Sequence, residues 1–232
     1  MKNLMQAKIL LSIIKLSTHG QTSLYEIHKN SHISTLTIEK TLTKLVEKNL
    51  IKLKGGKIEA SSEQRLKLAL LAIQQGADLE NTCRYLEWEE FEDLAIVALE
   101  LSDFVTHKHF RFKSTLRRYE IDILGFRNPF ILSIDCKHWR RSWQRAATKK
   151  MVEAQFQRTA ALVAFPLKII KKGRIEDWNK AMLIPVVLTL FKTPFKIYLG
   201  VPIVPILSFH NFLLNIPTYE DELTKFNVKV TP

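Results

Sequence analysis

The chain has 232 residues, of which 46% are hydrophobic and 25% are charged, a globular composition with room for one large core or two modest ones. The formal net charge of +12 favours a polyanionic partner, with nucleic acid first and an anionic membrane surface second. Two cysteines, Cys83 and Cys136, are too few for a disulfide framework, which excludes the disulfide-rich secreted class. We expect both to be free thiols in a reducing compartment.

The hydropathy pattern predicts a soluble, cytoplasmic protein without a membrane partner. The N-terminal apolar residues have helical spacing and no small-residue cleavage site, which favours a buried helix over a signal peptide. The apolar run over residues 182–191 is shorter than the roughly 20 residues that a bilayer span needs.

The first 60 residues predict three helices followed by a two-stranded hairpin. Apolar residues recur at helical spacing over residues 3–17. Ser23 is placed to cap a short second helix, and Glu26 completes a capping box. A third helix is expected from Ser34 or Thr35 to about Lys48. Its inward face should contain Leu36, Ile38, Leu42 and Leu45. Gly55-Gly56 then makes a tight turn between two lysine-rich strands.

This order of elements resembles the winged helix-turn-helix domain, over residues 1–60. The resemblance implies that the third helix enters the major groove of DNA. Its exposed face would carry Thr35, Thr37, Lys40, Thr41 and Lys44, among which Lys40 and Lys44 are candidate nucleic-acid contacts. The alternative is a module that binds only protein, since winged helices also serve in dimerisation.

Residues 61–86 predict a helical connector with a break at Gly76. The helical spacing of its apolar residues predicts a packed face made of Leu66, Ala69, Leu70 and Ile73.

A further helix is expected over residues 88–102, with an apolar stripe and an acidic start. The predicted stripe contains Phe91, Leu94, Ala95, Ala98 and Leu101. Glu89, Glu90 and Asp93 are expected to be solvated. Glu92 lies beside a second apolar row, where a carboxylate is unfavourable unless it has a metal or a cation as partner.

Two strands follow, over residues 119–126 and 130–137. Period-2 alternation predicts Glu120 and Asp122 on one face of the first strand. In the second strand, Asp135 and Lys137 share a face at the end of an apolar run. An ionised pair at that position is hard to explain by packing, although a surface ion pair on an ordinary strand is the alternative.

Three acidic elements and a lysine thus occur in order: Phe91-Glu92, Glu120-Ile121-Asp122 and Asp135-Cys136-Lys137-His138-Trp139. This arrangement resembles the PD-(D/E)xK nuclease superfamily, in the branch of Mrr-type restriction endonucleases and archaeal Holliday-junction resolvases, over about residues 88–160. The sequence departs from the pattern at Ile121, where the superfamily's name has proline, and at Asp135, where this branch usually has glutamate.

The resemblance implies a Mg²⁺ site, with Mn²⁺ as a possible substitute and no other small-molecule cofactor. Asp122, Asp135 and the backbone carbonyl of Cys136 would bind the metal. Glu92 would bind it directly, through water or at a second position, and Glu120 is a lower-ranked ligand. Lys137 would orient the attacking water, help deprotonate it, or stabilise the developing charge on phosphate.

Basic and aromatic residues alternate around this motif, which suits contact with a phosphate backbone. The candidate contacts are Arg117, Arg118, Arg140, Arg141 and Arg145. The alternative is a solvated helix face. Gln155 resembles a glutamine that some relatives place near the site, and a plain surface glutamine is the alternative. Further strands are expected over residues 161–165, 184–191 and 197–207, with a helix over 175–180.

The sequence therefore predicts an α/β (α+β) restriction-endonuclease-like mixed sheet flanked by helices and preceded by a winged helix. The predicted boundaries are 1–60 for the winged helix, 61–86 for the connector and 87–232 for the nuclease domain. The expected activity is a Mg²⁺-dependent endodeoxyribonuclease acting on duplex or branched DNA, by resemblance as a homodimer. The alternatives are a non-catalytic DNA-binding regulator with a nuclease-like fold, and a structure-specific junction or flap nuclease.

Overall fold

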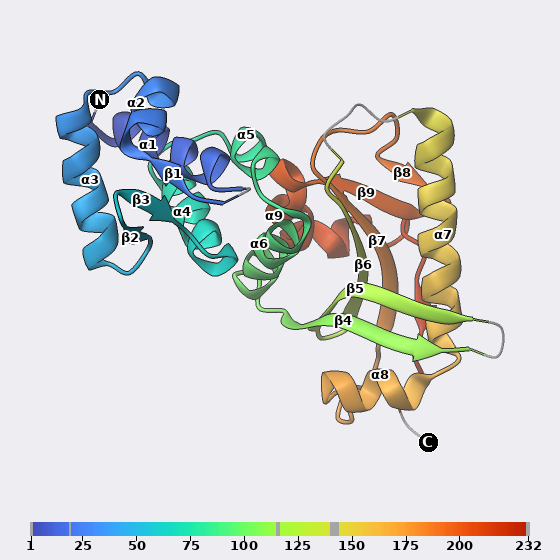
Figure 1. The fold of residues 1–232 in the computed structure, drawn as a ribbon. Coiled ribbons are helices and arrows are strands. Elements are labelled where there is room, and N and C mark those ends of the chain that lie inside the picture. The colour runs from blue at the N-terminus through green and yellow to red at the C-terminus, as the bar shows by residue number, and fades with distance from the viewer. Residues whose placement is uncertain (1, 19, 115–116, 140–143, 231–232) are drawn as a thin grey trace. The chain divides into compact units, whose positions relative to one another are not determined.

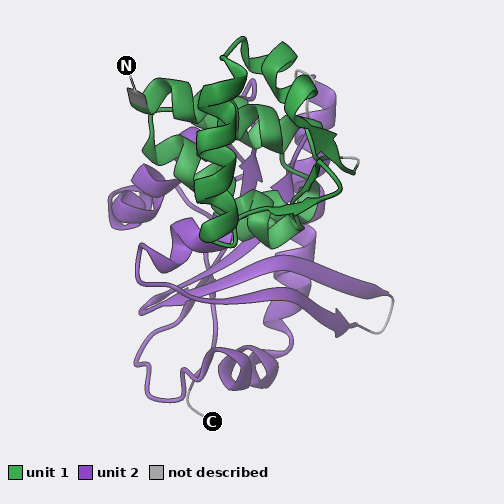
Figure 2. Cartoon of the chain, turned by 60° about the vertical axis from the view of Figure 1, so that its left-hand side comes forward, with its two compact units in different colours: residues 1–94 green, residues 95–232 purple. Residues whose placement is uncertain are grey.

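The computed structural model describes residues 2–18, 20–114, 117–139 and 144–230. The chain divides into two compact units, residues 1–94 and residues 95–232 (Figure 2). The division falls inside helix α6 (Trp88–Glu100). The segment expected as a connector, residues 61–86, therefore belongs to the first compact unit. None of the described helices is long and apolar enough to cross a membrane.

The first unit is built from helices around a small antiparallel sheet (Figure 1). Its helices are α1 (Lys2–Leu16), α2 (Leu24–Ser31), α3 (Thr35–Glu47), α4 (Ser62–Gln74) and α5 (Leu79–Arg84), and its strands are β1 (Thr22–Ser23), β2 (Lys52–Lys54) and β3 (Lys57–Glu59). The strand order is β1-β3-β2. The capping box of Ser23 and Glu26 is confirmed at the start of α2. Gly55 and Gly56 make the predicted turn with φ of +57° and +73°, a region that favours glycine.

The core of this unit lies where α1 packs against α2, α3 and α4. Ile38, Leu42 and Leu45 of α3 are buried as predicted, whereas Leu36 is exposed. The predicted face of α4 is confirmed at Ala69 but rotated at its other three residues. Its buried residues are Gln64, Arg65, Leu68, Ala69 and Ala72, while Leu66, Leu70 and Ile73 are only half-buried. The rotation places the guanidinium of Arg65 inside the unit.

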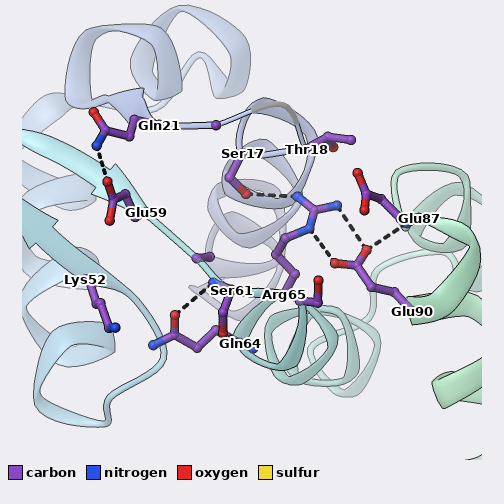
Figure 3. Close-up of a pocket in the computed structure, with 13 residues that line it drawn as sticks. Ser17, Thr18, Gln21, Lys52, Glu59, Ser61, Gln64, Arg65, Glu87 and Glu90 are labelled. Atoms are coloured by element: carbon purple, nitrogen blue, oxygen red, sulfur yellow. Dashed lines mark hydrogen bonds and ion pairs between the residues drawn. The ribbon is translucent and has the colours of Figure 1, made fainter.

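Arg65 forms a buried ion pair with Glu90 that joins α1, α4 and the start of α6 (Figure 3). The guanidinium Nε lies 2.7 Å from Glu90 Oε1, and Nη2 lies 3.2 Å from Oε2. Arg65 also donates to Ser17 Oγ and to the carbonyls of Ile14 and Tyr85. Glu90, expected to be solvated, is 1% exposed, and its pairing with Arg65 explains how a carboxylate is accommodated there.

These groups line a cavity of about 420 Å³ on the first unit. The hydrogen bonds of Arg65 use all five guanidinium N–H donors, so the buried cation has no donor left for a ligand. The ion pair therefore has a structural role, and the cavity is a polar surface depression around it.

The second unit is a mixed sheet with helices on both faces. Its strands are β4 (Val105–Lys113), β5 (Arg118–Arg127), β6 (Phe130–Lys137), β7 (Met182–Thr189), β8 (Ile197–Tyr198), β9 (Val201–Pro205) and β10 (Phe226–Asn227). Its helices after α6 are α7 (Arg145–Val163), α8 (Pro166–Gly173) and α9 (Ile206–Asn215), followed by the 3-10 turn η1 (Ile216–Tyr219). The strand order is β4-β5-β6-β7-β9-β8, with β10 also on β7 (Figure 1). The pairs β6–β7 and β7–β9 are parallel, and the others are antiparallel.

Neighbouring residues of β5 show which helices cover each face. A side chain at Gly125 would come within 3.3 Å of Leu99, on the last turns of α6, and of Phe104. The next residue, Phe126, packs instead against Gly173 at the end of α8. Because successive strand residues point to opposite faces, α6 and α8 cover opposite sides of the sheet. Leu162 of α7 joins the core cluster of Phe126, so α7 lies on the α8 side.

The helix predicted over 88–102 and the strands predicted over 119–126, 130–137 and 184–191 correspond to α6, β5, β6 and β7, but three other predictions are wrong. Residues 161–165 end α7 instead of forming a strand, because Leu162 continues the buried face of that helix. The helix expected over 175–180 is instead α8, with Pro166 at its start, where proline is well tolerated. The strand expected over 197–207 is split into β8 and β9 by a turn at Gly200, with φ of +67°, and α9 begins at Ile206.

Candidate functional site

Strands β5 and β6 bring Asp122 and Asp135 together. Their antiparallel ladder extends from Arg127↔Phe130 to Ile123↔Ile134, and Asp122 and Asp135 are the next residue on each strand. Along the other edge of β6, Asp135 and Lys137 lie opposite Val187 and Thr189 of β7. The predicted acidic pair is thus placed at one end of a buried apolar strand.

Both carboxylate oxygens of Asp135 contact a cation. Lys137 Nζ lies 2.7 Å from Oδ2, as the shared strand face predicts. Arg158 Nη1, from α7, lies 2.6 Å from Oδ1. The side chain of Asp135 is 3% exposed, against 26% for Lys137 and 22% for Arg158. The two cations balance a carboxylate that would otherwise be strongly unfavourable at this depth.

Asp122 is held by the backbone of the neighbouring strand. Its Oδ2 accepts a hydrogen bond of 2.8 Å from the amide of Cys136. Burial raises the pKa of Asp122, and the adjacent charge of Asp135 raises it further. The Cys136 amide, Lys137 and Arg158 act in the opposite direction but do not cancel the rise. A nearby cation stabilises the ionised form of two buried carboxylates that repel each other.

Helix α7 fixes this end of the sheet through buried polar contacts. Gln155 is fully buried and donates to the carbonyl of Ser133 at 2.6 Å. Thr159 donates to Ser133 Oγ at 3.0 Å, and Arg158 Nη1 donates to Gln155 Oε1 at 3.1 Å. Gln155 is therefore no surface residue, and it connects β6 to the guanidinium that contacts Asp135.

Glu120 does not share the environment of Asp122. It pairs with Arg111 Nε at 2.8 Å and with His109 Nδ1 at 3.0 Å across the β4–β5 ladder. Arg111 holds the pKa of Glu120 below its ordinary value, with His109 contributing less. In the described ladder the pairing passes from Lys108↔Ile123 to Phe110↔Ile121, and His109, opposite Asp122, has φ of +52°.

Glu92 is fully buried in α6, within the first compact unit. Asp122, Asp135 and Lys137 belong to the second unit, so the grouping of Glu92 with them stays a prediction. Among the described residues, no group of three or more His, Cys, Asp or Glu side chains could hold a metal ion. Further ligands for a metal at Asp122 and Asp135 would come from backbone oxygen, water, substrate or the predicted Glu92.

The predicted basic contacts are placed in several parts of the structure. Arg117 lies over the Tyr119 ring at 4.4 Å, and Arg145 lies over the Phe195 ring at 5.8 Å. Arg118 is exposed at the start of β5. Arg140 and Arg141 lie outside the described residues.

On α3, Lys40 and Lys44 are exposed, as the prediction for its solvent face requires. Thr41, predicted on the same face, is buried instead. Its hydroxyl donates to the Thr37 carbonyl at 2.9 Å, which satisfies the polar group inside the unit.

Sequence reasoning missed Arg158. The only available signal was its position one helical turn after Gln155, which places both residues on one face of α7. Nothing in a single sequence shows that this face meets Asp135, because the two residues are 23 positions apart and on different elements.

No protein-family model matches the chain. The chain is 28% identical over 134 residues to an uncharacterised protein of Archaeoglobus fulgidus, a match that covers 58% of this chain and 95% of that protein. A crystal structure of a protein of unknown function matches with a TM-score of 0.29 and 16% identity, over 43% of this chain and 46% of the other. A Vibrio cholerae protein matches with a TM-score of 0.39 and 11% identity, over 95% of this chain and 53% of the other. The chain is thus aligned to about half the length of each solved protein, and TM-scores of this size support no argument about function.

Proposed function

We propose that the chain is a metal-dependent nuclease of the PD-(D/E)xK type that hydrolyses phosphodiester bonds in DNA, with a restriction-endonuclease-like second unit. The observation that carries the proposal is the group formed by Asp122, Asp135 and Lys137. Two buried carboxylates and a lysine converge at the end of β6, on the strands where the sequence motif puts them. Ion pairs of ordinary surface strands do not need two buried acids side by side.

The residues present fit a hard divalent cation. Asp122 and Asp135 offer carboxylate oxygens, the ligands that Mg²⁺ and Mn²⁺ prefer, and a bound cation would relieve the repulsion by Asp135 that contributes to the raised pKa of Asp122. The carbonyl of Cys136, between Asp135 and Lys137, is the proposed backbone ligand. Such a cation, when bound, activates water and neutralises charge on phosphate.

Lys137 is the proposed catalytic side chain beside the acids. Its Nζ lies 2.7 Å from Asp135 Oδ2, and its side chain is 26% exposed, so it is positioned by the acid and accessible from solvent. From that place an ammonium group can orient an attacking water or stabilise negative charge that develops on a phosphate oxygen. Asp135 limits the rotamers of Lys137 and so pre-organises it.

The far half of the β4–β5 hairpin supports binding to a polyanion. Among the described residues, the β5–β6 ladder stops at Ile123, so this half continues as a two-stranded ribbon (Figure 1). Phe112 and Tyr119 stack on each other at 5.1 Å and pack into the core. On alternate positions, Lys113 and Arg118 are exposed and directly opposed, an unfavourable like-charge pair that a phosphate backbone would relieve.

The first unit supports duplex binding as a winged helix. Its helices α1, α2 and α3 precede the β2–β3 hairpin, and β1 pairs with β3. That order and the turn at Gly55-Gly56 agree with the winged-helix resemblance, and Lys40 and Lys44 point to solvent from α3. We propose that α3 contacts the major groove and that the protein acts as a homodimer, with one site for each strand.

A cleavage assay tests the proposal. The protein is incubated with linear duplex, single-stranded, flap and four-way-junction DNA and with structured RNA, in Mg²⁺, Mn²⁺ or EDTA. Metal-dependent cutting that disappears in Asp135→Asn and Lys137→Gln supports the nuclease. Glu220→Gln is the matched control, because Glu220 is an acid of the same unit that pairs with Lys225 and should leave cutting intact. Cutting that persists in Asp135→Asn would refute the assignment of the site.

The second candidate is a non-catalytic nucleic-acid-binding protein with a nuclease-like fold. It is favoured by one observation, that Lys137 and Arg158 already neutralise both oxygens of Asp135. Salt-dependent binding of DNA, with no cutting on any substrate in either metal, would select this candidate over the nuclease.

A further inference from the structure

Arg158 occupies the position on Asp135 that a metal would need. Its Nη1 lies 2.6 Å from Oδ1, while Lys137 Nζ lies 2.7 Å from Oδ2. Each carboxylate oxygen has two lone pairs, but a guanidinium 2.6 Å from Oδ1 strongly repels a divalent cation bound to the same oxygen. The contact between Arg158 and Asp135 therefore competes with metal binding at Oδ1.

The Arg158 guanidinium is hydrogen-bonded to Gln155 and is also partly exposed to solvent. Arg158 Nη1 also donates to Gln155 Oε1, and Gln155 is fixed by the Ser133 carbonyl at 2.6 Å. Yet the Arg158 side chain is 22% exposed, whereas Asp135 is 3% exposed. A guanidinium at the border of solvent can leave the acid for water without unfolding α7, because its long side chain reorients about several bonds.

We propose that Arg158 is an internal counter-ion, which closes the site in the metal-free protein and is displaced from Asp135 when a divalent cation binds. The inference rests on the proposed metal site at Asp122 and Asp135. It assigns to Arg158 a regulatory role at that site: the metal-free protein keeps its acids neutralised, and metal affinity is set by the loss of this ion pair. Lys137 stays on the other oxygen throughout.

Removal of the Arg158 guanidinium should lower the stability of the metal-free protein and raise its affinity for a divalent cation. Without metal, Arg158→Gln leaves Asp135 with Lys137 alone, so the variant unfolds at a lower temperature than the wild type. With metal, no ion pair has to be broken, so Mn²⁺ binds roughly ten- to a hundredfold more tightly, the equivalent of one charge-assisted hydrogen bond. Arg158→Lys keeps a charge but loses the planar fork, and its affinity should fall between the two.

The experiment is a calorimetric titration of full-length protein with Mn²⁺, at constant pH and ionic strength, with melting curves in EDTA. Lys149→Gln is the matched control, because Lys149 is a cation on the same helix but lies over Tyr198, and the variant should bind Mn²⁺ as the wild type does. Asp135→Asn should abolish binding.

Tighter Mn²⁺ binding by Arg158→Gln, with a lower melting temperature in EDTA, is the expected result. Equal or weaker binding by this variant, with intact binding by the wild type, would overturn the counter-ion while leaving the nuclease proposal in place. Wild-type protein that binds no Mn²⁺ would overturn the metal site itself and the inference with it. If Arg158→Gln does not fold, the comparison of Arg158→Lys with wild type decides in the same way.

Discussion

The buried ion pair of the first unit makes a quantitative prediction for Arg65→Met. Arg65 is 3% exposed, Glu90 is 1% exposed, and all five guanidinium donors are used. Methionine leaves Glu90 buried with the Glu87 amide, at 2.7 Å, as its remaining hydrogen-bond donor among the contacts described here. Removing one partner of a buried pair costs about 3–5 kcal/mol, and we expect the upper part of that range because the carbonyls of Ile14 and Tyr85 each also lose one of their donors.

Two cysteines, one in each unit, provide the assay. Cys83 is buried in α5 of the first unit and Cys136 is buried in β6 of the second. Maleimide labelling across a urea series, read by mass spectrometry, reports the opening of each unit separately. Cys83 in Arg65→Met should become reactive at much lower urea than in wild type, with Cys136 as internal reference.

The double variant Arg65→Met, Glu90→Met is the control for the charge. It removes both ions and fills the site with apolar side chains, so it should regain most of the lost stability. A single variant within about 1 kcal/mol of wild type would refute the reasoning, since that is the value of a surface pair.

Three further predictions concern charge and burial elsewhere. Asp122 has a raised pKa, so its contribution to stability is present below its ordinary value of 3.8 and is lost as pH rises through the folded-state pKa. Metal-free Asp122→Asn should therefore gain stability relative to wild type as pH rises in urea titrations, and a relative loss would contradict this. Replacing Lys113 and Arg118 with glutamine should weaken binding to DNA of any sequence. The slope of log binding constant against log salt concentration, measured by fluorescence anisotropy, should fall by roughly 0.9 per lost phosphate contact. An unchanged slope would mean that the β4–β5 ribbon does not contact phosphate. Burial, with smaller effects of Asp78 and Glu80, raises the pKa of Cys83 from 9.0 to about 12. In the native protein its thiol should therefore react with maleimide about a thousandfold more slowly at pH 8 than a free cysteine does. Fast labelling without urea would contradict the buried position.

The elements predicted best are those specified by neighbouring residues. The capping box of Ser23 and Glu26 and the turn at Gly55-Gly56 involve contacts over three residues or fewer, so the sequence contains the whole determinant. The strand of residues 130–137 was predicted with its correct bounds because an apolar run ends abruptly in two charged residues.

The errors come from contacts between residues far apart in the sequence. Glu90 was predicted to be solvated because its partner, Arg65, is 25 positions away on another helix. The apolar stripe predicted for α4 was right at Ala69 only, since Arg65 lies on the buried face of the helix. The period of a strand likewise gave no sign of Arg111, the residue across the β4–β5 ladder that pairs with Glu120. Period and propensity do not identify partners on other elements.

Two acid–arginine pairs of the chain differ in how fully the hydrogen-bond donors of the arginine are used. Arg65 uses every donor, is almost fully buried and contacts three backbone or hydroxyl oxygens besides its acid. Arg158 makes both of its hydrogen bonds to described side chains through Nη1, and its side chain is partly exposed. The first pair can be broken only by unfolding. The second can open at the cost of two contacts, and the acid it would release lies beside another buried acid whose pKa is raised. The difference in donor saturation, more than burial of the acid, is what makes Asp135 a candidate for chemistry and Glu90 a part of the scaffold.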